Sequence, residues 1–182
     1  SERQFENAMY PGAPRGSRRT YLEEYGCAAW TEPALLAIIA KAGPRIVEIG
    51  AGGGQWKTAL EAAGADVLAF DNRIEKDTPQ YVTSKTKEIV LQGDERKLQE
   101  PGMEKRALLL VYPPQGPMAA NCVRLYSGDV IIFVGEGRSG VNADSAFFDL
   151  LEDGWKLECK LPLAPFPGGF EKLYIVYRKK KK

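Results

Sequence analysis

The sequence predicts an α/β protein with a doubly wound, mostly parallel sheet of seven strands that ends in an antiparallel hairpin. Three observations carry this prediction. Short apolar runs alternate with helical segments from residue 31 onward, and the first apolar run ends in a turn made almost wholly of glycine. Two strand-like segments joined by a loop rich in Pro and Gly close the chain. The 182 residues suffice for one domain with a substantial core.

Residues 1–30 are predicted to form an N-terminal arm that is partly extended. Most of the segment is rich in Pro, Gly and Arg and carries no apolar periodicity. Its arginines could contact phosphate, but a solvated arm is the simpler interpretation. Thr31 then offers an N-cap, with Pro33 in the first turn, and the helix that follows is expected to reach Ala42 before Gly43 ends it.

The first strand, predicted over residues 46–49, leads into the glycine-rich turn and a helix that is expected to reach Ala62. Glycine lets the backbone approach a ligand without interference from a Cβ atom, and a helix N-terminus offers unpaired N–H groups. At the end of a first strand, this combination is typical of nucleotide-like cofactor sites. A glycine-rich turn that binds no ligand is the alternative.

The spacing of the glycines argues against two common phosphate-binding motifs. A dinucleotide-binding turn has the pattern G-x-G-x-x-G, and its third glycine would fall on Gln55. A Walker A loop ends in Gly-Lys-Ser/Thr, whereas Lys57 here follows Trp56. The pattern that fits is acidic-x-Gly-x-Gly-x-Gly, formed by Glu48, Gly50, Gly52 and Gly54.

Carboxylates follow the next two predicted strands. The second strand, residues 67–70, ends at Asp71, about twenty residues after the glycine turn, where a carboxylate can accept hydrogen bonds from both ribose hydroxyls. Taken alone, an aspartate at a strand end is more often a cap or turn residue. A polar loop is predicted over residues 72–87, and a third short strand over 88–91 precedes Asp94.

The remaining elements complete the alternation of strands and helices. The apolar run 108–111 is typical of a central strand buried on both faces, and it leads into a loop that begins at Tyr112. Glu136 follows the fifth strand, where it is a base or substrate anchor or, more simply, the partner of an arginine. The other predicted elements are a helix over 119–125, a strand over 129–134, a helix after the cap 142–144, and hairpin strands over 155–161 and 172–178.

The composition limits the chemistry available to the chain. A hydrophobic content of 44%, a charged content of 27% and a net charge of +1 are ordinary for a globular protein in water. The absence of histidine excludes Ser-His-Asp and Cys-His catalysis and histidine-containing zinc sites. The three cysteines form no C-x-x-C pair, so we expect no metal site and a reducing, cytoplasmic location.

The sequence shows no targeting or membrane signal. It has neither an apolar run long enough to span a bilayer nor a signal-peptide pattern, so we expect no membrane partner. It begins at Ser1 rather than at a methionine, as a trimmed chain or a piece of a longer one would.

Together, the acidic-x-Gly-x-Gly-x-Gly pattern, Asp71 and the terminal hairpin make the chain resemble the class I S-adenosylmethionine-dependent methyltransferases, which share a Rossmann-like fold. The resemblance covers residues 30–178. It implies S-adenosyl-L-methionine as cofactor. The glycines would make room for its methionine and ribose parts, and Glu48 would anchor the motif.

The same resemblance assigns further cofactor contacts. Asp71 would bind the ribose hydroxyls, and Asp94 would bind the adenine amino group; the alternative for Asp94 is a cap on the following turn. Tyr25 and Trp30 would either line the pocket or be simple packing aromatics.

The loop after the central strand is where the chain departs from part of this family. Methyltransferases that act on amino groups carry Asp/Asn-Pro-Pro-aromatic here, and a proline carbonyl helps to hold the target amine. In this chain Tyr112 and Gln115 replace the outer two residues, and only Pro113 and Pro114 match. N-methylation of adenine, cytosine or glutamine is therefore in doubt. We assign Tyr112, Pro113 and Pro114 as the catalytic candidates that face the acceptor, with Tyr112 acting through a hydrogen bond or a cation–π contact.

The sequence thus indicates a methyltransferase-like domain at residues 31–178 with a basic tail at 179–182. The predicted function is transfer of a methyl group from S-adenosyl-L-methionine to an unknown acceptor, which could be protein, RNA or a small molecule. A catalytically inactive domain that serves as a structural or RNA-associated subunit is the alternative, and the basic termini leave nucleic acid as a candidate partner. An NAD(P)-dependent oxidoreductase is a third interpretation, weakened by Gln55 and by the hairpin.

Overall fold

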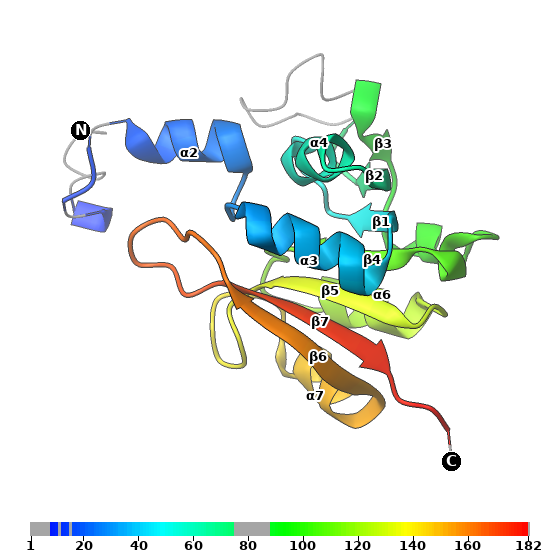
Figure 1. Cartoon of the computed structure of the whole chain (residues 1–182). Helices are drawn as coiled ribbons and strands as arrows, with labels where there is room; N and C mark the ends of the chain where they lie inside the picture. Colours follow the sequence, from blue (N-terminus) through cyan, green and yellow to red (C-terminus); the bar gives the residue numbers. More distant parts are fainter. Residues whose placement is uncertain (1–7, 11, 15, 75–87, 182) are drawn as a thin grey trace.

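The computed structural model describes residues 8–10, 12–14, 16–74 and 88–181, and a seven-stranded sheet forms its centre (Figure 1). The strand order is β3-β2-β1-β4-β5-β7-β6; β7 lies antiparallel to β5 and β6, and the other neighbours are parallel. The predicted doubly wound sheet with a C-terminal hairpin is confirmed. The strands are β1 (Arg45–Ile49), β2 (Asp66–Asp71), β3 (Leu91–Gln92), β4 (Ala107–Val111), β5 (Val130–Gly135), β6 (Trp155–Pro162) and β7 (Lys172–Arg178).

Helices cover both faces of the sheet. One apolar cluster joins side chains of α3 and α4 to β1, β4, β5 and β7, and a second joins α6, α7 and the first 3-10 turn to the opposite face. The central strands β1, β4 and β5 carry apolar side chains on both faces because both faces are covered. The helices are α3 (Glu32–Ala42), α4 (Gln55–Ala62), α6 (Met118–Leu125) and α7 (Ser145–Gly154), with 3-10 turns η1 (Glu95–Gln99) and η2 (Met103–Lys105).

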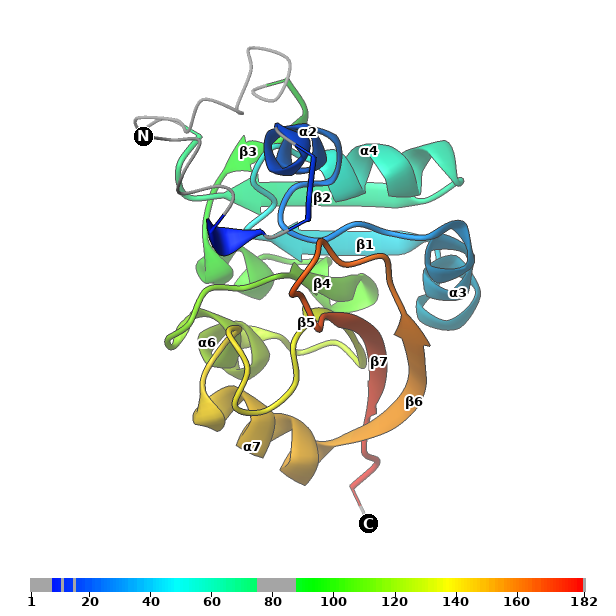
Figure 2. The ribbon, with the colours of Figure 1, turned by 90° about the vertical axis from the view of Figure 1, so that its left-hand side faces the viewer.

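The strand order reverses at β1, which pairs with β2 on one side and β4 on the other. Figure 2 looks onto the end of the sheet where the glycine turn and the loops after β2, β4 and β5 emerge. In a doubly wound sheet, ligands bind at this point because the connections on the two sides of the switch lead away to opposite faces and leave a crevice.

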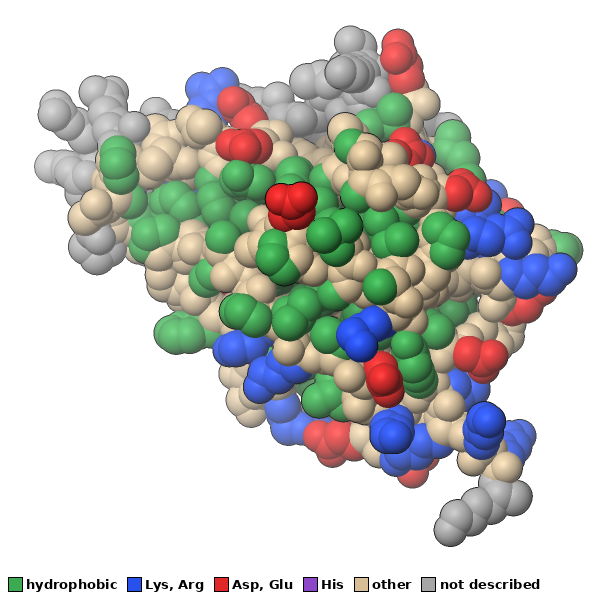
Figure 3. Space-filling view, in the orientation of Figure 1, with side chains coloured by type: hydrophobic (Ala, Val, Ile, Leu, Met, Phe, Trp, Pro, Cys, Tyr) green, Lys and Arg blue, Asp and Glu red, His purple; other side chains and the backbone are tan. Residues whose placement is uncertain are grey.

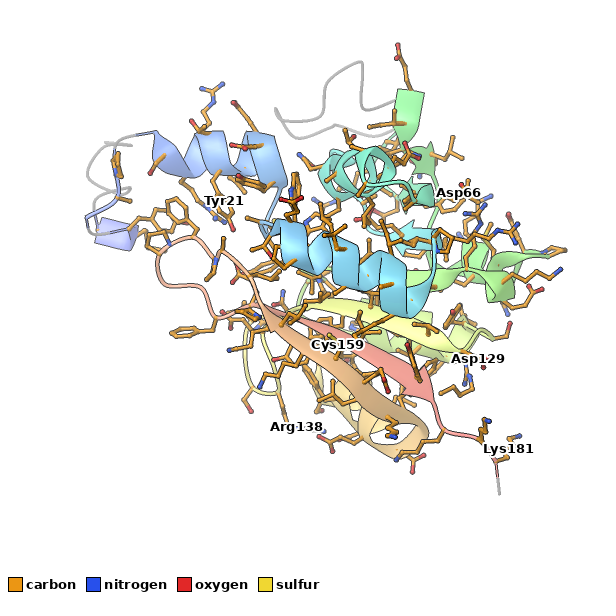
Figure 4. The ribbon with its side chains drawn as sticks, in the orientation of Figure 1. Tyr21, Asp66, Asp129, Arg138, Cys159 and Lys181 are labelled. Carbon is orange, nitrogen blue, oxygen red and sulfur yellow. The ribbon has the colours of Figure 1, made fainter. Side chains whose placement is uncertain are left out.

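The N-terminal segment contains a helix that the sequence pattern did not predict. Helix α2 (Ser17–Tyr25) lies at the same end of the sheet, although its side chains form no apolar stripe. Tertiary contacts hold it in place. The Tyr21 hydroxyl donates to the Ala164 carbonyl at 3.1 Å and accepts from the Ala29 amide at 2.9 Å. Figure 4 shows Tyr21 pointing from α2 toward the loop between β6 and β7.

Tyr25 and Trp30 are packing residues. The centroids of their rings are 4.8 Å apart, and Trp30 in turn packs on Trp56 at the start of α4, with ring centroids 5.9 Å apart. Of the two interpretations that the sequence left open for these aromatics, the structure favours mutual packing. They connect α2 to the core.

The prediction for the third strand was wrong in its position. Residues 88–91 were expected to form it, but Glu88 and Ile89 are helical and β3 spans Leu91–Gln92. Ile89 and Val90 instead pack on the glycine turn, since a Cβ atom on Gly54 would lie within 2.9 Å of both side chains. Of the loop predicted over residues 72–87, all but the first three residues lie outside the described part of the chain.

The basic C-terminal residues surround the exposed end of β7. Figure 3 shows Lys and Arg side chains gathered there, with acidic side chains among them. Lys179 is bound to the body of the domain, because its Nζ donates to the carbonyls of Glu152 and Asp153. Among the described residues, no helix is both long enough and apolar enough to cross a bilayer.

Candidate functional site

The glycine turn takes a backbone path that side chains disfavour. Gly50, Gly52 and Gly54 have φ angles of 80°, 56° and 78°, in the left-handed region where glycine is favoured. A Cβ atom on Gly50 would lie 2.9 Å from the Met118 side chain, whereas one on Gly52 would meet no atom within 4 Å. The turn thus packs tightly against α6 at Gly50 and leaves its Gly52 face open. All three glycines fall in one turn, as the sequence predicted.

Asp71 is joined to this turn by a hydrogen bond. Its Oδ2 accepts from the Gly52 amide at 2.9 Å, and its Oδ1 accepts from the Arg73 amide at 2.9 Å. The carboxylate is half-buried and lies on the cavity wall beside Gly52. Each oxygen retains a lone pair for a further donor.

Glu48 lies beneath the turn, buried in the sheet. Its side chain is 1% exposed, and its Oε2 has no hydrogen-bond partner among the described residues. Burial raises the pKa of this carboxyl to about 8; the nearby charge of Asp71 adds to the rise and that of Lys57 opposes it. Glu48 is therefore protonated at neutral pH, and it does not line the cavity. Its predicted role as anchor of the motif stays a prediction.

Asp94 forms the cap that the sequence analysis gave as the alternative. It is the N-cap of η1, where its Oδ1 accepts from the Arg96 amide at 3.0 Å. The Arg96 guanidinium also donates to both of its oxygens, and this pairing lowers the pKa of the Asp94 carboxyl. Asp94 nevertheless lines the cavity, so its predicted adenine contact stays a prediction.

These elements enclose one cavity of about 490 Å³ at the switch point. The volume falls within the range of small-molecule sites, roughly 300–1,000 Å³. The loops after β1, β2 and β4 contribute walls, as do the start of α6 and the segment before α3. The lining residues are Cys27, Ile49, Gly50, Gly52, Asp71, Asn72, Arg73, Ile74, Gly93, Asp94, Glu95, Tyr112, Pro114 and Met118.

Tyr112 borders this cavity in a strained conformation. Its φ is 49°, which is unusual for an aromatic residue, and its amide donates to the Val134 carbonyl at 2.6 Å. Burial raises the pKa of the Tyr112 hydroxyl, and the charges of Glu171 and Glu136 raise it further. The structure therefore keeps this hydroxyl protonated, as a hydrogen-bond donor beside the cavity.

The two prolines after Tyr112 are held by their carbonyls. Pro113 is buried, and its carbonyl accepts from the Asn142 Nδ2 at 3.0 Å; the Pro114 carbonyl accepts from the Ala143 amide at 3.1 Å. Asn142 is itself buried, and its Oδ1 accepts from the Glu136 amide at 2.8 Å. Of the two prolines, only Pro114 lines the cavity. The loop is thus fixed to the turn after β5 through Asn142.

Sequence reasoning missed several residues that border the cavity. Cys27 comes from the connection between α2 and α3, and Met118 is the first residue of α6. Neither belongs to a recognisable motif. The position of Met118 offered one signal, because it starts the helix that follows the central strand at the switch point.

Comparison with known proteins adds information at the level of the fold. No protein-family model matches the sequence, and no curated protein matches it. Solved structures do match across most of the chain. Magnesium protoporphyrin IX methyltransferase from Synechocystis PCC 6803 with bound S-adenosylmethionine matches with a TM-score of 0.56 and 11% identity, over 96% of this chain and 89% of that one.

Two further structures match at similar levels. A TehB-like S-adenosylmethionine-dependent methyltransferase from Corynebacterium glutamicum gives a TM-score of 0.53 at 22% identity, over 91% of this chain and 96% of that one. The 1,6-didemethyltoxoflavin-N1-methyltransferase from Burkholderia thailandensis, bound to its acceptor and S-adenosylhomocysteine, gives 0.52 at 18% identity, over 91% and 83%. The chain has the class I methyltransferase fold.

Within the methyltransferase fold, Gln55 explains why the dinucleotide pattern fails. It is the first residue of α4, and its Nε2 donates to the Leu22 carbonyl of α2 at 3.4 Å. In a dinucleotide-binding turn this position is glycine, so that helix and strand can pack closely. Here the side chain binds the N-terminal helix instead.

We predict that Glu48→Gln changes how stability depends on pH. The pKa of Glu48 is raised in the folded chain, so between about pH 4.5 and about pH 8 the folded state holds a proton that the unfolded state has lost. The wild-type free energy of unfolding should therefore fall as pH rises through this window. The Gln side chain does not titrate, so the variant lacks this fall in the free energy of unfolding. Urea denaturation at several pH values should show the variant gaining stability relative to wild type as pH rises, with a constant difference above the window. Glu158→Gln, at an exposed position, is the control, and parallel curves for Glu48→Gln and wild type would contradict the prediction.

We also predict that Asn142→Ala destabilises the domain. The substitution leaves the Pro113 carbonyl and the Glu136 amide without partners, at roughly 1–3 kcal/mol for each buried group. Urea denaturation measures the change. Asn121→Ala removes a matched side chain that accepts from Arg124 on the surface of α6, and it should change stability by less than about 0.5 kcal/mol. Equal effects of the two substitutions would show that Asn142 does not hold the Tyr-Pro-Pro loop.

Proposed function

We propose that the chain is an S-adenosylmethionine-dependent methyltransferase whose acceptor is still to be identified. The observation that carries the proposal is the bond between Asp71 and the glycine turn at the switch point, where both border the same cavity. The match in fold to structures that contain S-adenosylmethionine or S-adenosylhomocysteine supports the choice of cofactor.

The residues on the cavity wall fit this cofactor. The face of Gly52 is open where a Cβ atom would otherwise project, so backbone can approach the methionine and ribose parts. Asp71 has free lone pairs for the two ribose hydroxyls. Ile74 and Met118 supply apolar surface, and Asp94 would accept from the adenine amino group beside its bond to Arg96.

The bound cofactor would supply an activated methyl group on a good leaving group, and the chain needs neither histidine nor metal for this chemistry. The work left to the protein is orientation, which contributes about 7–11 kcal/mol in the best cases. Gly50 and Gly52 would fix the cofactor from one side of the cavity. Tyr112 and Pro114 would form the wall on the acceptor side, with the Tyr112 hydroxyl protonated and its ring held by the strained backbone.

A second candidate is a domain that binds the cofactor or a partner without catalysis. The observation that favours it is that both proline carbonyls of the Tyr-Pro-Pro loop are already engaged, by Asn142 and Ala143. In methyltransferases with Asp/Asn-Pro-Pro-aromatic, a proline carbonyl helps to hold the amine. Binding of cofactor without turnover of any acceptor would support this candidate.

We expect calorimetric titration to show micromolar binding of S-adenosylmethionine and S-adenosylhomocysteine and no binding of NADH. Asp71→Ala should weaken binding of both adenosyl ligands roughly 10- to 100-fold, because the variant loses hydrogen bonds to a charged acceptor. Asp66→Ala is the matched control, since Asp66 belongs to the same strand but pairs with Arg106 at the opposite end of the sheet (Figure 4).

The control should bind S-adenosylhomocysteine within about twofold of wild type, because its ion pair is partly exposed. Thermal unfolding of both variants should be cooperative, which separates loss of ligand contact from loss of fold. If Asp71→Ala bound the adenosyl ligands as tightly as wild type, Asp71 would not be the residue that binds the ribose hydroxyls. No binding of either adenosyl ligand to the wild-type chain would overturn the proposed function.

A further inference from the structure

Three neighbouring strands bring polar side chains together around Tyr112, which lines the cavity. Tyr112 follows β4, Glu136 follows β5, and Glu171 precedes β7. The register pairs Val111 with Val134 and pairs Gly135 with Lys172. One step further along each strand, Glu136 and Glu171 therefore stand next to each other at the carboxyl end of the sheet, beside Tyr112.

Glu136 is buried, and each of its two carboxylate oxygens accepts a hydrogen bond. Its Oε2 accepts from the Val141 amide at 3.1 Å, and its Oε1 accepts from the Phe170 amide at 3.2 Å. One carboxylate thus joins the loop after β5 to the loop between β6 and β7. These bonds fix the position of its negative charge.

Glu171 is buried with a weaker set of partners, because the hydrogen bond that acts on its carboxyl comes from its own backbone amide. Its side chain is 4% exposed, and its Oε2 has no hydrogen-bond partner among the described residues. Burial raises the pKa of this carboxyl, and the charge of Glu136 raises it further. A buried carboxyl oxygen without a partner costs free energy in the folded state, and a hydrogen-bond donor that reached it would recover that cost.

Arg18, the cation whose charge acts on Glu171, does not fill this role. The guanidinium of Arg18 lowers the pKa of Glu171, but no ion pair joins the two in the described part of the chain. Arg18 instead lies against three aromatic rings, with its Cζ 5.6 Å from the Tyr10 centroid, 5.4 Å from that of Tyr21 and 5.0 Å from that of Phe166.

Glu171 acts on residues that border the cavity. Apart from burial, its charge is a cause of the raised pKa of both Tyr112 and Cys27, and both residues are part of the cavity wall. Neither Glu136 nor Glu171 lines the cavity itself, so the acidic pair lies behind Tyr112, on the side of the cavity away from Asp71 and the glycine turn.

We propose that Glu136 and Glu171 form an anionic subsite that binds a cationic nitrogen group, an ammonium or a guanidinium, of the methyl acceptor. That the bound group belongs to a methyl acceptor rests on the proposed function, whereas the binding of a cation by the subsite does not. Such a group would donate an N–H to the Glu171 Oε2, neutralise the paired carboxyls and lie near the face of the Tyr112 ring. A neutral hydroxyl or a carboxylate would gain little or be repelled there.

The test is calorimetry on the chain saturated with S-adenosylhomocysteine, with phenethylamine and its guanidine analogue as probes. Phenethyl alcohol is the neutral control of the same shape. We expect the cationic probes to bind at least roughly tenfold more tightly than the alcohol, because only they are charged donors. Because a bound cation favours the ionised carboxylate, the affinity for the cationic probes should rise with pH as Glu171 loses its proton. Tyr112, Cys27, Tyr21 and Arg18 also face this group, and substitution of Glu171 distinguishes its proton from theirs.

Glu171→Gln keeps the shape of the side chain and removes its charge. It should weaken binding of the cationic probes roughly 10- to 100-fold and abolish the rise of their affinity with pH, while S-adenosylhomocysteine binds as in wild type. Glu171→Asp keeps the carboxyl on a side chain that is one methylene shorter. Its affinity for the cationic probes should lie between those of wild type and Glu171→Gln. Glu158→Gln, an exposed glutamate of β6, should behave as wild type.

Several results would overturn the subsite: equal binding of the amine and the alcohol, no binding of either cationic probe to the wild-type complex, or unchanged binding to Glu171→Gln. Failure of the proposed function is a separate result. If S-adenosylhomocysteine does not bind, the same probes titrated into the free chain still decide whether the acidic pair binds a cation.

Discussion

The hydrogen bond between the Asp71 carboxylate and the Gly52 amide is the interaction on which the rest of the site depends. It joins the carboxyl ends of β1 and β2, and it requires the left-handed backbone that Gly50 and Gly52 supply. The amides of Gly50 and Ala51 also donate to the Phe70 carbonyl, so the turn is fixed to β2 by backbone as well as by side chain. With the turn fixed, α6 can pack against it at Gly50 while the Gly52 face stays open.

The carboxyl groups of the site fall into two kinds that differ in how they are satisfied. Asp71, Asp94 and Glu136 accept hydrogen bonds from backbone amides, which hold their carboxylates in fixed positions. Glu48 and Glu171 are buried with an oxygen that has no partner among the described residues, and burial raises the pKa of each. Glu48 lies below the cofactor half of the cavity and Glu171 beside the acceptor half. The first kind fixes the loops of the site, and each carboxyl of the second kind keeps one oxygen without a partner among the described residues.

The fold was predictable to the extent that local pattern determines it. Buried strands such as β4 read as continuous apolar runs, and Thr31 and Asp144 cap their helices as their positions indicate. Helix α2 was not predictable, because its stability comes from contacts such as that of Tyr21 with Ala164, far away in the sequence. The third strand was misplaced because Ile89 and Val90 are apolar through packing on Gly54 rather than through strand pairing. For the same reason Cys27 and Met118 carried no local signal of their place on the cavity wall.

The Tyr-Pro-Pro loop shows why a motif alone does not determine acceptor chemistry. In the amino-group pattern, the first residue and a proline carbonyl supply the acceptors for an amine on the β4 side of the site. Here a tyrosine replaces the first residue, and Asn142 and Ala143 already bind the carbonyls of Pro113 and Pro114. A buried carboxyl oxygen without a partner is found instead just before β7, where the Glu171 Oε2 lies next to the bonded carboxylate of Glu136. If this chain recognises a nitrogen group of its acceptor, the recognising carboxyls lie at β5 and β7, one and two strands further along the sheet than the Tyr-Pro-Pro loop after β4. Asn142 connects the two positions, because it bonds both the Pro113 carbonyl and the Glu136 amide.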